Sequence, residues 1–217
     1  MFLTRNGRRS ALGMALAAML VAFGVGPAHA LTLSLVGGDA AVVPASFDLN
    51  AETSLSTGDP LTVLNSANDF DSSGSTNGLF LDAAANLTFE FLGSEASREN
   101  TFSVTGLGQL FTNAGGATTT ALFAAGIIPF SFATEGGTEV AANDGSIFPG
   151  LSIAFADITP TSVILLFGNG AGDADFDDLA VKVSVSPVPL PPAVWLFLSA
   201  ILGLVSFSRI RRSERTA

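Results

Sequence analysis

The chain contains no cysteine and no tyrosine, and it has a single histidine, His29, and a single tryptophan, Trp195. Both lie in apolar terminal segments, so residues 31–186 offer no imidazole, thiol, phenol or indole. Serine–histidine and cysteine–histidine nucleophiles need an imidazole base, and typical zinc sites need histidine or cysteine, so these classes are excluded for this part of the chain. Disulfides are excluded too, but about 155 residues suffice for a single hydrophobic core without them.

Positive charge is nearly absent from the same part of the chain. Residues 31–186 contain two cations, Arg98 and Lys182, against 18 of the 19 carboxylates, which gives a net charge of about −16. Such a surface repels nucleic acid and anionic lipid headgroups. We therefore expect no nucleic-acid partner, whereas divalent cations are attracted.

The first 30 residues have the layout of a secretory signal peptide. Arginines at the start are followed by an apolar run over residues 11–25 and then by the small-residue triplet Ala28-His29-Ala30. The apolar run is about 15 residues, shorter than the roughly 20 of a membrane-spanning helix. We expect cleavage before Leu31 and export of the residues that follow.

A second apolar segment lies near the C-terminus. Pro191 and Pro192 suit the first turn of a helix, and the apolar residues 193–208 follow them. About 17 helical residues span about 25 Å, slightly less than a bilayer core of about 30 Å. Trp195 suits the outer interface, and Arg209, Arg211, Arg212 and Arg215 follow on the other side. The positive-inside rule predicts a cytoplasmic C-terminus with residues 31–187 outside the cytoplasm.

Five residues precede this helix: Val188, Pro189, Leu190, Pro191 and Pro192. Together with the apolar helix and the arginine cluster, they resemble the C-terminal sorting tail of PEP-CTERM proteins, in its VPLPA-type variant. Residues 187–217 carry the resemblance; Leu190 stands where the family's glutamate would be, and Pro192 replaces the usual alanine. The resemblance implies a Gram-negative, exopolysaccharide-producing bacterium, transient anchoring in its inner membrane, and an exosortase that removes the tail during export.

The domain between these segments shows alternation of apolar and polar residues, the period of a half-buried strand. Asn143-Asp144-Gly145 predicts a hairpin turn, and residues 114–126, rich in alanine, are compatible with a short helix or a loop. Many short strands without an amphipathic helix predict an all-β fold, a β-sandwich of jelly-roll type. The predicted strands are 31–35, 45–49, 61–64, 87–91, 100–104, 127–132, 151–155, 162–167 and 179–185.

One acidic motif precedes the last predicted strand. Its carboxylates at alternate positions can converge in a loop that curls around an ion, and oxygen ligands at this spacing suit calcium. The loop is not an EF-hand, because Asp178 stands where glycine is needed and Ser184 where glutamate is needed. It also resembles the Asp-rich turn before the last strand of β-sandwich domains of unknown function that often accompany such tails. The candidate calcium ligands are Asp173, Asp175, Asp177 and Asp178, and a solvated acidic turn is the alternative.

Two other motifs have simpler interpretations. The stretch from Asn68 to Gly74 has two carboxylates at the same offset, and we interpret it as a loop. The alternating glycines at 168, 170 and 172 do not form a nucleotide loop, because the predicted continuation is a strand and supplies no helix N-terminus for phosphate.

These observations predict an exported, non-catalytic protein of the cell surface or extracellular matrix, released through an exosortase and possessing a domain that calcium stabilises or bridges to exopolysaccharide. The alternative is a module that binds a surface polysaccharide or a partner protein through an exposed apolar patch. A third interpretation, a carboxylate-pair hydrolase, requires two acidic side chains about 5–10 Å apart in a cleft.

Overall fold

The computed structural model describes residues 32–70, 73–143, 145–170, 175–187 and 199–201. The predicted signal peptide and the sorting motif at residues 188–192 lie outside the described residues, as does most of the predicted C-terminal helix. Residues 199–201 are helical. Within the described ranges, no helix has the length and apolar character needed to cross a membrane.

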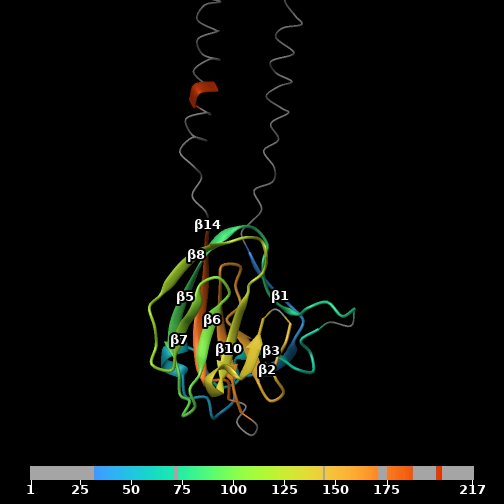
Figure 1. The fold of residues 1–217 in the computed structure, drawn as a ribbon, viewed down its shortest axis with the longest axis vertical. Coiled ribbons are helices and arrows are strands. Elements are labelled where there is room, and N and C mark those ends of the chain that lie inside the picture. The colour runs from blue at the N-terminus through green and yellow to red at the C-terminus, as the bar shows by residue number, and fades with distance from the viewer. Residues whose placement is uncertain (1–31, 71–72, 144, 171–174, 188–198, 202–217) are drawn as a thin grey trace, which may run out of the picture. The chain divides into compact units, whose positions relative to one another are not determined.

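The described part of the chain is all-β, as predicted, and three antiparallel sheets account for its strands (Figure 1). Besides residues 199–201, it has two short helical elements, α2 (Asn50–Thr53) and the 3-10 turn η1 (Glu135–Gly137). The largest sheet has the order β2 (Asp39–Val42), β3 (Pro60–Asn65), β12 (Ser152–Ala156), β13 (Ser162–Gly168), β14 (Leu179–Pro187), β5 (Ala85–Gly93), β8 (Thr119–Phe123).

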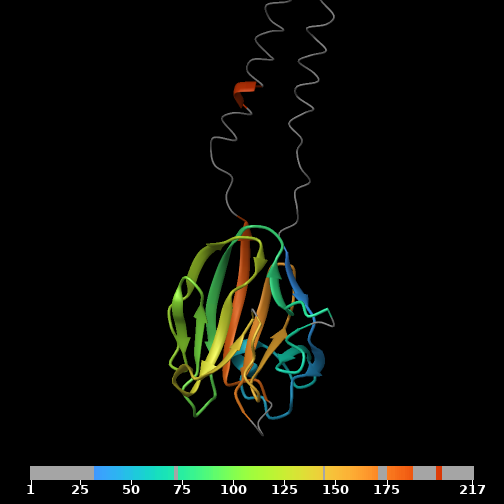
Figure 2. The ribbon, with the colours of Figure 1, turned by 45° about the vertical axis from the view of Figure 1, so that its right-hand side comes forward.

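The second sheet has the order β11 (Glu139–Ala142), β10 (Phe130–Thr134), β6 (Thr101–Val104), β7 (Gly108–Thr112). The third consists of β1 (Leu33–Val36), β4 (Gly78–Leu81) and β9 (Gly126–Ile127). Figure 2 shows the orange strands of the largest sheet between its green strands and its blue and teal ones.

The main core lies between the seven-stranded and the four-stranded sheets. Phe132 of β10 stacks on Phe167 of β13, with ring centroids 5.0 Å apart and the ring planes at 4°. Phe102 of β6 lies edge-on to Phe132 at 5.0 Å, and all three rings are fully buried. Figure 1 shows β6 and β10 in front of β14, whose core side chains belong to the same cluster. Phenylalanine, the only aromatic residue of the domain, thus joins two sheets into a sandwich-like arrangement.

The seven-stranded sheet is covered on its other face by a smaller apolar cluster. Phe47, Leu49 and Leu55, around α2, pack with Ile164 and Leu166 of β13. Because both faces of β13 are covered, its run Val163–Phe167 is buried at every position. A strand with only one face covered would show polar residues at alternate positions.

Two of the predicted elements are wrong, and a third, the strand at residues 127–132, is divided between β9 and β10 of different sheets. Residues 45–49 form a turn and loop instead of a strand, because the Phe47 N–H donates to the Pro44 carbonyl oxygen; the alternation there reflects burial of Phe47 and Leu49. Residues 114–126, predicted as helix or loop, contain strand β8, which pairs with β5. Tertiary contacts decided both cases, since local composition and spacing do not distinguish a packed loop from a paired strand.

Other predicted features are confirmed in the described residues. The chain reverses after β11, where Ala141 bridges to Ile147 and the Ala142 N–H donates to the Ser146 carbonyl oxygen. Leu179, Val181 and Val183 on β14 are fully buried in the main core, as the alternation predicts.

The two ends of the described domain meet at one turn. The Leu33 N–H donates to the carbonyl oxygen of Pro160 at 2.8 Å, and the Val185 N–H donates to that of Thr161, also at 2.8 Å. Strand β14 runs from the acidic turn to this point over nine residues, about 30 Å at roughly 3.3 Å per residue. The Asp-rich turn and the two ends therefore lie at opposite poles of the sheet.

Asp82 forms hydrogen bonds with the start of β1, at the pole where the two ends of the domain meet. Its carboxylate accepts hydrogen bonds from the hydroxyls of Thr32 and Ser34, and these bonds, that of Thr32 first, lower the pKa of Asp82 below its ordinary value of 3.8. A lowered pKa in the folded state means that the carboxylate contributes stability above its unfolded pKa, and that this contribution is lost as pH falls through the folded pKa.

We expect the pKa of the Asp82 carboxyl, measured by NMR titration, to lie below 3.8. Thr32→Val should raise it towards the ordinary value, and Ser34→Ala should raise it less, because Thr32 makes the larger contribution. Equal pKa values in the parent protein and the Thr32→Val variant would contradict the assignment.

Candidate functional site

The candidate site is the turn between β13 and β14, at the pole opposite the two ends. β13 ends at Gly168 and β14 begins at Leu179, and a strand follows the alternating glycines, as predicted. Of the predicted calcium ligands, Asp175, Asp177 and Asp178 are described, whereas Asp173 lies outside the described residues. The described three are 7%, 1% and 9% exposed, so the interpretation of this motif as a solvated turn is wrong for them.

Asp178 closes the base of the turn. Its Oδ2 accepts the N–H of Asn169 at 2.6 Å, and its own N–H donates to the Phe167 carbonyl oxygen at 3.2 Å. Its carbonyl oxygen accepts the Ser94 hydroxyl at 2.6 Å. The carboxylate of Asp178 thus has a structural function, because it supplies a hydrogen-bond acceptor to a backbone N–H that would otherwise be left without one.

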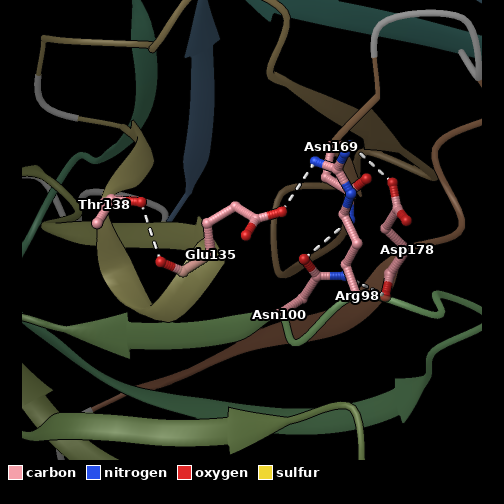
Figure 3. A network of polar contacts seen from close by, with 6 residues as sticks. All are labelled: Arg98, Asn100, Glu135, Thr138, Asn169 and Asp178. Carbon is pink, nitrogen blue, oxygen red and sulfur yellow. Dashed lines mark hydrogen bonds and ion pairs between the residues drawn. The ribbon is translucent and has the colours of Figure 1, made fainter.

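An asparagine network continues from this point into the segment after β5 (Figure 3). Asn100, fully buried, accepts a bond from the Asn169 side chain at 2.9 Å through its Oδ1, and its N–H donates to Asn113 Oδ1 at 2.9 Å. Asn113 in turn donates to the carbonyl oxygens of Ala96 and Arg98. These bonds hold residues 94–100 against the acidic turn.

Asp177 connects the turn to two segments much earlier in the chain. Its Oδ2 accepts the N–H of Asp48 at 2.7 Å, a residue 129 positions earlier, and its carbonyl oxygen accepts the N–H of Glu95 at 3.0 Å. Between Asp175 and Asp177, Phe176 is buried in the smaller apolar cluster with φ of 62°. A bulky residue in this left-handed region is uncommon, and burial of its ring keeps it there. Phe176 therefore anchors the turn and fixes the two neighbouring carboxylates.

Beside the turn lies a polar cleft of about 550 Å³. Arg98, one of two cations in residues 31–186, lies at its wall and forms an ion pair with Glu135 at 3.3 Å (Figure 3). Both side chains are about half exposed, so solvent screens the pair and it contributes little stability. This polar cleft does not supply the exposed apolar patch that the binding-module interpretation requires. Among the cleft residues are Glu95, Ser97, Arg98, Glu139, Asn169 and Asp178.

Carboxylates and amides predominate at this pole, together with the Arg98 guanidinium and the Ser94 hydroxyl. In the described ranges, no three carboxylate or imidazole side chains gather closely enough to form a metal cluster by themselves. Asp48, Ser94, Asn100 and Asn169 support the turn, but sequence analysis did not single them out. Asn169 lies within the glycine motif and binds Asp178 nine positions away, whereas no local signal could have found Asp48, whose partner lies 129 positions away. Comparisons with protein-family models, curated proteins and solved structures found no match.

Proposed function

We propose that the protein is an exported, non-catalytic component of the cell surface or extracellular matrix, sorted through a PEP-CTERM-like tail. In this proposal, residues 1–30 are a signal peptide, residues 31–186 form a jelly-roll-type sandwich, and residues 187–217 carry the sorting motif, a single membrane helix and the arginine cluster. An exosortase-type enzyme recognises the tail and removes it.

The observation that carries the proposal is the position of the two ends of the domain. Leu33 and Val185 hydrogen-bond to the neighbouring residues Pro160 and Thr161, so both predicted membrane-directed segments attach at one pole. A domain whose ends left at opposite poles, about 30 Å apart along β14, would need a linker to bring both to one membrane. The observed arrangement supports simultaneous attachment of both segments during export, with the acidic turn facing away from the membrane.

The absence of imidazole and thiol from residues 31–186 supports the non-catalytic part of the proposal. Within the cleft, Asp178 already accepts the Asn169 N–H, and Arg98 is paired with Glu135. These two side chains are thus held by structural partners.

The test is the intact mass of the protein recovered outside the producing cells. We expect a chain that begins at Leu31 and lacks Trp195 and the terminal arginines. Pro189→Ala combined with Pro191→Ala should leave the tail uncleaved and the protein in the membrane fraction, because the motif that the enzyme reads is altered.

The matched control is Pro149→Ala, an exposed proline of the domain, which should be processed like the parent chain. Recovery of a full-length tail from the extracellular protein would overturn the sorting proposal and favour a plain membrane anchor.

A further inference from the structure

The carboxylate of Asp177 has one oxygen without a partner. Asp177 is 1% exposed, its Oδ2 accepts the Asp48 N–H at 2.7 Å, and its Oδ1 is buried with no hydrogen bond among the described residues. Removing an ionised oxygen from water without giving it a donor or a cation is costly. Buried polar atoms of this kind are normally satisfied by a water or an ion.

In the part of the chain that the structure describes, no cationic side chain is seen to supply the missing positive charge. Of the two cations in residues 31–186, Arg98 is paired with Glu135, and Lys182 lies in β14 opposite Glu90 of β5. Asp175, also buried, adds a second carboxylate two residues before Asp177. The turn thus concentrates negative charge, in a domain that carries about −16 overall.

The described carboxylates of the motif have different structural environments. Asp178 Oδ2 accepts the Asn169 N–H, and Phe176 anchors the turn in the smaller cluster. Asp177 Oδ1 is held in place by the same elements but has no partner among the described residues. Asp178 therefore supports the turn, and Asp177 is the residue available to a ligand.

We infer that Asp177 Oδ1 binds a hard divalent cation, calcium, with Asp175 as the neighbouring carboxylate. Calcium takes backbone carbonyl and water oxygens as readily as carboxylates, so a site with few acidic side chains suits it, whereas magnesium requires a stricter octahedral geometry. The ion neutralises Asp177 and strengthens the connection between the turn and Asp48. The inference concerns the domain alone and does not depend on how the tail is processed.

The test is calorimetric titration of calcium chloride into the full chain, purified in detergent and freed of metal with a chelator. We expect saturable binding with a Kd on the order of 10⁻⁴–10⁻³ M, the range of extracellular modules. At ten times that concentration, the Tm should rise by about 3–6 °C, and magnesium at the same concentration should raise it less. Calorimetry suits the domain, because it has no tyrosine or tryptophan to report binding by luminescence.

Asp177→Asn keeps the shape of the side chain and an acceptor for the Asp48 N–H, but removes the charge. It should weaken calcium binding at least tenfold, whereas its Tm without calcium should equal or exceed that of the parent chain, because an uncompensated buried charge is gone. A purely structural carboxylate would instead give a lower Tm without calcium.

The matched control is Asp82→Asn, which removes an exposed carboxylate at the opposite pole and should leave calcium binding unchanged. Three results would each overturn the inference: no saturable binding to the parent chain, equal binding by Asp177→Asn, or an equal rise in Tm with magnesium. If Asp177→Asn does not fold, Asp175→Asn tests the same site and should also weaken calcium binding, and equal binding by that variant would overturn the inference.

Discussion

Asn143→Ala is expected to lower the free energy of unfolding by about 3–5 kcal/mol. Asn143 is fully buried, and its side chain forms hydrogen bonds with the backbone of two segments distant from it in sequence. Its Nδ2 donates to the carbonyl oxygens of Leu79 at 2.9 Å and Ile128 at 2.8 Å, and its Oδ1 accepts the Leu79 N–H at 2.8 Å. Alanine would remove all three bonds and leave the buried Leu79 N–H without an acceptor.

The close packing around Asn143 leaves no easy way to compensate for the lost hydrogen bonds. Gly78 lies directly against Asn143, with φ of 153°, and a Cβ there would come within 2.6 Å of the Asn143 carbonyl oxygen. The two residues thus form a close junction between the start of β4 and the end of β11, with little room for a replacement water.

The measurement is urea unfolding of the purified chain followed by circular dichroism, which reports on the sheets directly. Asn86→Ala, at a half-buried position on β5, is the matched control and should cost less than about 1 kcal/mol. A loss for Asn143→Ala no greater than that of the control would mean that the Leu79 N–H finds another acceptor.

Phe132→Ala is expected to cost about 3–5 kcal/mol as well, for a different reason. The Phe132 ring is fully buried and contacts aromatic rings from both facing sheets: Phe167 at 5.0 Å, Phe102 at 5.0 Å and Phe130 at 6.1 Å. Truncation would remove these contacts and leave a cavity between the sheets.

The same urea unfolding compares this variant with two others. Phe132→Leu keeps most of the volume and should cost roughly 1–2 kcal/mol. Leu122→Ala on β8, where the side chain is 64% exposed, should change stability by less than about 0.5 kcal/mol. Equal losses for Phe132→Ala and Leu122→Ala would show that the two sheets are not joined through this ring.

Strand prediction succeeded where one face of a strand is apolar and failed where burial had another cause. Alternation in β14 gave the correct core face, because Leu179 and the valines after it pack between the sheets. At residues 45–49 the same alternation came from a loop lying on the outer face of the seven-stranded sheet. β2, β4, β7 and β11 were not predicted, since none of them alternates strictly between apolar and polar residues.

At the candidate site, too, part of the arrangement could be predicted from the sequence and part could not. The spacing of the aspartates marked the turn before β14 as unusual, and their identity as acidic ligands is a property of the sequence. Their separate environments are not, because Asp178 is paired with Asn169 while Asp177 meets the backbone of Asp48. Only folding brings those partners together. From the even spacing alone, all the aspartates were predicted to have the same role as calcium ligands.

The residue types available for chemistry, the negative charge of the domain, its all-β character and the presence of two apolar terminal segments could all be read before the fold was known. These follow from composition and from short-range periodicity, which are readable without a fold. The contacts of the folded chain were needed to show that both ends of the domain meet at one pole and that Asp177 is buried with one oxygen that receives no hydrogen bond from the described residues. Each depends on a contact between residues more than a hundred positions apart, Leu33 with Pro160 and Asp177 with Asp48, and no local pattern encodes such contacts.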